Sequence, residues 1–192
     1  MVSKHARRLR YWQGLTVGLL TAGYAGYYLC RSNLSVALPL IIADLGSKGL
    51  NPDQARIQLG TMVSLGVLAY ALGKFLSGGL ADFVGGRRNF LLGMAGSIFS
   101  TIAFALAGTI PIFTLSWMAN RLVQSLGWAG IVKITSKWFS FSTYGTVMGV
   151  ISLSYLFGDA AARQFMGMLI ARVLIGEASS GRLPASYSYY WL

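Results

Sequence analysis

Five apolar stretches, each near or above the roughly 20 residues needed to cross a hydrocarbon core, fill most of this chain. They cover residues 12–42, 59–83, 90–109, 112–135 and 143–174. Backbone groups in lipid must be hydrogen-bonded within their own segment, and the stretches lack the two-residue alternation of barrel strands. The sequence therefore predicts an all-α, polytopic membrane protein with five transmembrane helices.

The composition argues against a soluble protein. Hydrophobic residues make up 55% of the chain and charged residues 11%, less than half of the roughly 25% usual in a soluble domain. The net charge is +11, but outside residues 4–10 the basic side chains are scattered between apolar runs and form no face for a phosphate backbone. We therefore expect a lipid bilayer around the chain and no nucleic acid as a partner.

Catalytic and metal chemistry find no support in the sequence. Cys30 is the single cysteine, which excludes an internal disulfide, and His5 is the single histidine, which leaves neither a zinc ligand set nor a Ser-His-Asp triad. Lys74 follows a glycine but precedes Phe75, so this is no nucleotide P-loop. We expect no metal, no cofactor and no enzymatic activity.

Basic residues between the stretches indicate the orientation. By the positive-inside rule, the side with more of them faces the cytoplasm. That side holds Lys4, Arg7, Arg8, Arg10, Arg87, Arg88, Lys133 and Lys137, and the other holds Lys48, Arg56, Arg172 and Arg182. Residues 1–11 are then a basic cytoplasmic tail and residues 12–176 a transmembrane bundle. Residues 177–192 form an external loop that leads into the start of a truncated sixth helix, or else a disordered tail.

Charged residues inside the stretches are the strongest functional signal. Each basic side chain costs about 2.5–3.5 kcal/mol at a helix centre, so it needs a partner, water or a bound ion. Asp159 and Arg163 lie four residues apart and can neutralise each other as a structural pair, whereas Lys74 can extend its stem to the interface. Arg31 and Arg121 have neither option. Near mid-depth and without an acid close in sequence, they predict a cavity for an anion, most simply a phosphate.

Tyrosines precede the first of these arginines. Tyr24, Tyr27 and Tyr28 lie within two helical turns of Arg31 and can line a polar cavity with hydroxyl donors.

Glycine spacing predicts close helix packing. The chain has 24 glycines, and small residues four apart allow helix backbones to approach one another. Gly14 with Gly18 and Gly145 with Gly149 have this spacing, and we expect them to lie at helix contacts.

The segment between the second and third stretches carries a specific motif. Residues 78–88 read Gly-Gly-Leu-Ala-Asp-Phe-Val-Gly-Gly-Arg-Arg, which resembles the signature loop of the major facilitator superfamily of transporters. Phe83 and Gly86 stand where that pattern usually has basic residues. The resemblance implies that Asp82 is a gate contact whose carboxylate bonds to backbone N–H groups in one conformation only. The gating motif consists of Asp82, Gly85, Arg87 and Arg88.

Further segments resemble one family within that superfamily, the organophosphate:phosphate antiporters. Residues 23–34 read Gly-Tyr-Ala-Gly-Tyr-Tyr-Leu-Cys-Arg-Ser-Asn-Leu, and Ala-Tyr-Ala-Leu-Gly-Lys-Phe follows at 69–75. Gln-Ser-Leu-Gly-Trp at 124–128 and Lys-Trp-Phe at 137–139 complete the match. The chain departs from the family where Ala129-Gly130 replaces two prolines. It also has Tyr155 where some bacterial members carry a histidine near the substrate.

The resemblance implies a function. Such a chain is the N-terminal half of a twelve-helix transporter in the inner or plasma membrane that exchanges an organic phosphate ester for inorganic phosphate by alternating access. One half cannot alternate, so it needs the missing C-terminal half or a second copy. Two rivals remain, a transporter-like membrane receptor for a phosphate ester and a facilitator of another organic anion. The expected substrate-binding residues are Arg31, Lys74, Tyr24, Tyr27, Tyr28, Arg121 and Tyr155.

Overall fold

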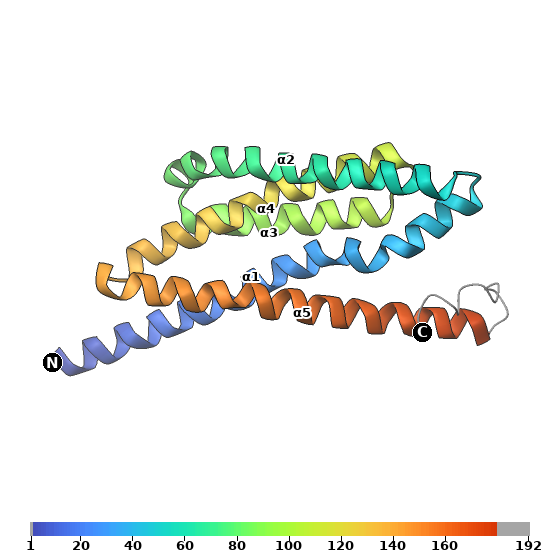
Figure 1. Ribbon diagram of the computed structural model, residues 1–192. Coiled ribbons are helices and arrows are strands. Elements are labelled where there is room, and N and C mark those ends of the chain that lie inside the picture. The colour runs from blue at the N-terminus through green and yellow to red at the C-terminus, as the bar shows by residue number, and fades with distance from the viewer. Residues whose placement is uncertain (1, 180–192) are drawn as a thin grey trace.

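The computed structural model describes residues 2–179, and these residues form five α-helices joined by short turns (Figure 1). The helices are α1 (Val2–Ser47), α2 (Pro52–Val84), α3 (Gly86–Ala105), α4 (Ile110–Trp138) and α5 (Phe141–Ser179). The all-helical prediction and the five segments are confirmed for this part of the chain.

The two outermost helices run further than the apolar pattern predicted. Helix α1 begins at Val2, so most of the expected basic tail is helical and continuous with the first stretch. Helix α5 continues to Ser179, past the predicted end of the bundle at residue 176. Polar residues can extend a helix once an apolar segment has nucleated it, because each added residue brings one more hydrogen bond. The expected start of a sixth helix lies at residues outside the described range.

Local sequence explains where α2 begins and ends. The side chain of Asn51 accepts a hydrogen bond from the backbone N–H of Asp53 at 2.9 Å, and Pro52 fills the first helical position. At the other end Gly85 has a φ of 88°, and its N–H donates to Ala81 O at 3.1 Å. A positive φ suits glycine, and this one residue turns the chain from α2 into α3.

The helices form two groups. Helices α2, α3 and α4 pack together along their lengths, and α1 packs mainly on α5 (Figure 1). A stripe of small residues along α2 lies against α4, where an added Cβ on Gly73 would come within 2.5 Å of Ser125 Oγ. The buried stripe comprises Gly66, Ala69, Gly73, Ser77 and Ala81.

The glycine pairs chosen from the sequence are not packing contacts in this structure. An added Cβ on Gly14, Gly18, Gly145 or Gly149 would meet nothing within 4 Å. Other glycines make the close approaches. Gly86 and Gly130 bring the start of α3 onto α4, and Gly158 brings α5 onto Ala25 of α1, each with a backbone atom 2.8 Å from an added Cβ. Spacing alone cannot identify the face of a helix that meets a neighbour.

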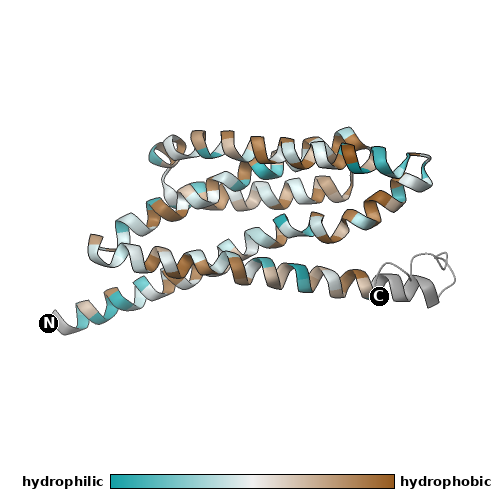
Figure 2. Cartoon of the chain, viewed as in Figure 1, coloured by the Kyte–Doolittle hydropathy of each residue, from teal (hydrophilic) through white to brown (hydrophobic). Residues whose placement is uncertain are grey.

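Many large apolar side chains of the bundle are exposed, and apolar residues recur along its helices (Figure 2). Phe75 and Phe83 of α2 are 86% and 91% exposed, and Phe141 at the start of α5 is fully exposed. Three helical segments of the described chain have the length and composition to cross a membrane, namely Lys4–Ser47, Pro52–Val84 and Phe141–Arg172. Such faces require lipid or further protein to cover them.

Candidate functional site

Cations from two helices meet at one tyrosine ring. The guanidinium carbon of Arg31 on α1 lies 5.0 Å from the ring centroid of Tyr70 on α2, and Lys74 Nζ lies 4.9 Å from the same centroid. Both distances fit a cation–π contact. The Tyr70 ring therefore stabilises two like charges that lie near each other and still repel.

Arg121 adds a third cation from α4. Its guanidinium carbon lies 4.4 Å from the ring centroid of Trp117 and is close enough to Arg31 for the two charges to repel. Arg121 Nε and Trp117 Nε1 are both buried and have no hydrogen-bond partner among the described residues. Two neighbouring donors without an acceptor favour an anion. We call Arg31, Lys74 and Arg121 the cation cluster.

No acid forms an ion pair with the cation cluster within the described part of the chain. Four ion pairs occur there, and none includes a member of the cluster. They are Asp44 with Lys48, Asp53 with Arg56, Asp82 with Lys133, and Asp159 with Arg163. The cluster therefore carries three positive charges with no ion-pair partner among the described residues, and the acid near Arg31, Asp159, is already paired with Arg163.

Tyrosines from α1 and α5 flank this charge. The guanidinium carbon of Arg31 lies 5.5 Å from the Tyr28 ring centroid. That ring is 5.6 Å from Tyr24 and 6.1 Å from Tyr155, centroid to centroid. Four of the seven predicted substrate residues, one of them from α5, thus form a continuous group in the structure.

Tyr27 does not join this group as a donor. Its hydroxyl donates to Phe90 O on α3 at 2.6 Å, and the residue is 3% exposed. An added Cβ on Gly127 would lie 2.8 Å from its ring, so the tyrosine fills the contact between α1, α3 and α4. In this conformation Tyr27 is a core residue, because both its ring and its hydroxyl are used in packing.

The pair predicted on α5 is confirmed. Arg163 Nε donates to Asp159 Oδ2 at 2.8 Å, and Ser32 of α1 donates to the other carboxylate oxygen. Asp159 therefore links α5 to α1 next to Gly158, which packs closely on Ala25 of α1. This acid is occupied by its own partners.

Asp82 forms an ion pair in this structure. Its carboxylate accepts from Lys133 Nζ on α4. The bond links the end of α2 to the last turns of α4. The bond to backbone N–H groups, which the resemblance implies for one conformation only, stays a prediction. Arg87 and Arg88, at the start of α3, line a nearby cavity of about 870 Å³, and no member of the cation cluster lines it.

Sequence reasoning missed Tyr70 and Trp117 as site residues, although a signal for them exists. Each precedes a cation of the cluster by four residues on its own helix, as Tyr28 precedes Arg31 by three. Side chains at these spacings share a helix face, so an aromatic side chain can contact the cation that follows it.

The sequence of this chain is similar to one protein family and to several known proteins. The model of the Major Facilitator Superfamily matches residues 20–189. The chain is 32% identical to a probable hexose phosphate transport protein of Chlamydia trachomatis over 85% of this chain and 34% of the relative. It is 28% identical to the glycerol-3-phosphate transporter of Bacillus subtilis over 81% of this chain and 33% of that protein.

A third relative is named as a sensor and not as a transporter. The membrane sensor protein UhpC of Escherichia coli is 25% identical over 72% of this chain and 30% of its own length. The chain spans about a third of the length of these relatives, and no solved structure matches it. The chain belongs to the major facilitator superfamily, and the relatives that it matches are members of the organophosphate:phosphate antiporter family.

Proposed function

We propose that this chain is the N-terminal half of a transporter that exchanges an organic phosphate ester for inorganic phosphate by alternating access. The observation that carries the proposal is the cation cluster, three positive side chains from three helices with no acid paired to them among the described residues. A phosphate monoester and inorganic phosphate both bring the dianionic charge that such a cluster lacks.

The residues take different roles in this proposal. Arg31 holds the phosphate through two parallel N–H donors, which its planar guanidinium presents in a fixed geometry. Lys74 adds a point charge beside Tyr70, and Arg121 adds Nε–H and the remaining guanidinium donors from α4. Tyr24, Tyr28 and Tyr155 offer hydroxyls to the phosphate or to the organic part of the substrate.

Alternating access requires a second bundle, because substrate in such folds binds between two halves that move against each other. The missing C-terminal half, or a second copy of this chain, supplies it. In the proposal the bond from Lys133 to Asp82 belongs to one of the two end states and breaks in the other. The motif of Asp82, Gly85, Arg87 and Arg88 is then a gate.

The proposed topology has five membrane spans with the N-terminus in the cytoplasm. Reporter domains fused after Arg88 or Lys137 are expected to be cytoplasmic, and those fused after Lys48 or Arg182 external. The reason is that loops rich in basic residues stay on the cytoplasmic side. A reversed result at two or more of these sites contradicts the five-span assignment.

The transport proposal is tested by counterflow in proteoliposomes that contain the transporter with both halves. Vesicles loaded with inorganic phosphate should take up labelled glycerol-3-phosphate or hexose 6-phosphate, and unloaded vesicles should not. Arg31→Ala should abolish uptake, whereas the control Arg56→Gln, which removes one charge from an exposed pair at the other end of α2, should leave it intact. Equal uptake of a dicarboxylate would favour the facilitator of another organic anion.

The relation to a membrane sensor favours a receptor as the second candidate function. A receptor would bind the same phosphate ester at the cation cluster and pass the signal to a partner. Calorimetry and counterflow on the same preparation separate the two. Binding of the ester without any phosphate-dependent uptake would identify a receptor.

A further inference from the structure

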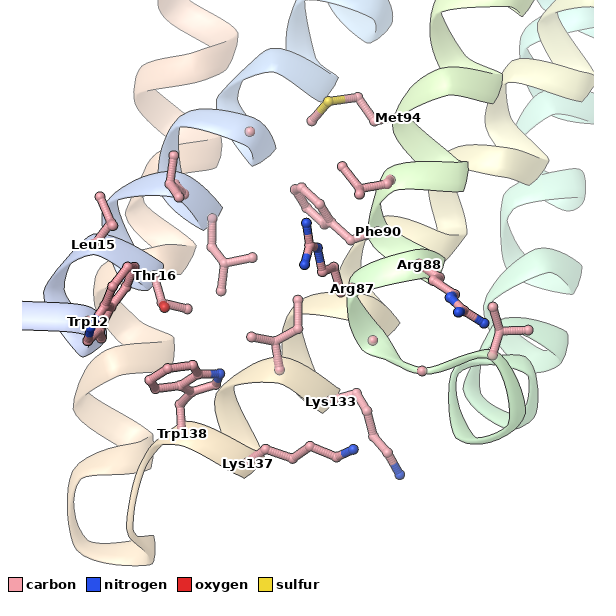
Figure 3. A pocket seen from close by; sticks show the side chains of 18 residues that line it. Trp12, Leu15, Thr16, Arg87, Arg88, Phe90, Met94, Lys133, Lys137 and Trp138 are labelled. Carbon is pink, nitrogen blue, oxygen red and sulfur yellow. The ribbon is translucent and has the colours of Figure 1, made fainter. Parts of the chain in front are cut away.

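The cavity of about 870 Å³ lies at the end of the bundle where α2 turns into α3 (Figure 3). Two contacts bound it. An added Cβ on Gly23 of α1 would lie 2.9 Å from Phe90 Cζ on α3, and Gln13 Nε2 of α1 donates to Trp138 O on α4 at 2.7 Å. The cavity is the space between these two contacts, a crevice with α1 on one side and α3 and α4 on the other.

Basic side chains from α3 and α4 line the crevice. Of its four basic residues only Lys133 has an acid partner, Asp82, while Arg87, Arg88 and Lys137 take part in no ion pair within the described part of the chain. Arg87 points toward the middle of the crevice, whereas Arg88 points away from it on the other side of α3 (Figure 3). The crevice therefore offers several cationic donors and no free carboxylate.

The remaining wall is apolar and open to the surroundings of the bundle. Leu19 of α1 is 64% exposed and Leu91 of α3 is 50% exposed. Trp12 of α1 and Trp138 of α4 also line the crevice, and both indoles are partly exposed. Tryptophan favours the depth of the lipid headgroups. The crevice therefore combines cations, indoles and aliphatic side chains in one lining.

We propose that this crevice binds an anionic phospholipid, with the headgroup phosphate at Arg87 and Lys137 and one acyl chain along Leu19 and Leu91. The crevice joins basic side chains to an apolar wall, as a phospholipid joins an anionic phosphate to acyl chains, and basic pockets between transmembrane helices suit anionic headgroups. A small soluble phosphate would leave the apolar wall uncovered. A zwitterionic lipid would bring an amine against the unpaired cations.

The lipid site is separate from the cation cluster and does not depend on transport. Native mass spectrometry of the purified full-length protein gives the test, with phosphatidylglycerol and phosphatidylcholine of identical acyl chains as probes. Phosphatidylglycerol should bind about tenfold tighter, since each basic residue near an anionic headgroup contributes to affinity. Arg87→Gln with Lys137→Gln should remove most of this preference, and the control Arg56→Gln at the other end of α2 should keep it.

A second variant keeps the proposal testable if the double substitution fails to fold. Thr16 lines the crevice from α1, and Thr16→Trp would fill it without changing any charge, so phosphatidylglycerol binding should fall about tenfold. Equal binding of the two lipids by the wild-type protein would overturn the proposal and would fit a protein segment that covers the crevice. Displacement of phosphatidylglycerol by millimolar inorganic phosphate would overturn it in favour of a soluble anion site.

Discussion

Two regions of this bundle place charged side chains within predicted membrane spans, and they stabilise these charges differently. At the contact of α1 and α5, Arg163 is paired with Asp159, which also accepts a hydrogen bond from Ser32. Between α1, α2 and α4, the cation cluster has aromatic rings beside it and no acid partner in the described structure. Both regions place charge inside predicted spans, but only the first is neutral by itself.

The difference separates a structural charge from one that awaits a ligand. A neutral pair with its hydrogen bonds satisfied needs no further partner, and its loss should affect folding. A cluster of like charges is unfavourable until an anion arrives, and its loss should affect binding. Substitutions in the two regions should therefore change different measured quantities.

The largest expected effect is at Arg31. Arg31→Ala should weaken phosphate-ester binding about a hundredfold, roughly 2.7 kcal/mol. Arg31→Lys should be nearly as damaging, since an ammonium cannot reproduce two parallel hydrogen bonds. Calorimetry on the purified full-length protein measures both. If Arg31→Lys binds within about threefold of wild type, Arg31 is only a structural charge and the contrast between the two regions disappears.

The next effect concerns Asp82, a paired charge that the proposal assigns to movement. Asp82→Asn removes the ionic part of its bond with Lys133 and should slow exchange about tenfold while substrate binding changes by only a few fold. Rates come from counterflow and affinities from calorimetry on one preparation. An equal loss in both would mean that Asp82 acts in folding or in the binding site itself.

The sequence predicted the helices and the position of the charges in them, because both follow from composition along a single segment. It identified Asp159 with Arg163, since residues four apart on one helix must share a face. It could not tell that the Tyr27 hydroxyl bonds to Phe90 O, 63 residues later, or that Ser32 bonds to Asp159. Those contacts depend on which helix faces meet.

The sequence also does not show which helix faces meet at Asp82 and at the glycines. Lys133 became the partner of Asp82 because Gly86 and Gly130 bring α3 onto α4 at this end of the bundle, an approach that no local motif specifies. Gly14 and Gly18 have the same four-residue separation as many packing pairs, yet nothing approaches them within 4 Å. Spacing along a helix restricts the available faces but does not choose the neighbour.

A smaller effect is expected at the paired region. Asp159→Asn should lower stability by about 1 kcal/mol, because Arg163 loses its counter-ion and both charges are partly exposed. Ester binding should stay within about threefold of wild type. The double variant Asp159→Asn with Arg163→Gln should recover part of the loss. Thermal unfolding in detergent measures the stability of the wild type and of both variants. A large drop in ester affinity would instead make Asp159 part of the substrate site.

The smallest effect is expected for Lys74→Arg. Lys74 is exposed at the surface of α2, and its Nζ lies 4.9 Å from the Tyr70 ring centroid. It acts as a point charge, so another cation of similar length should replace it, and arginine also stacks well on an aromatic ring. Ester affinity should stay within about threefold of wild type, whereas Lys74→Gln should cost about tenfold. If Lys74→Arg is as damaging as Lys74→Gln, the geometry of the ammonium group matters at this position, as that of the guanidinium does at Arg31. The cluster would then hold the anion through two contacts of fixed geometry, whereas this proposal has one.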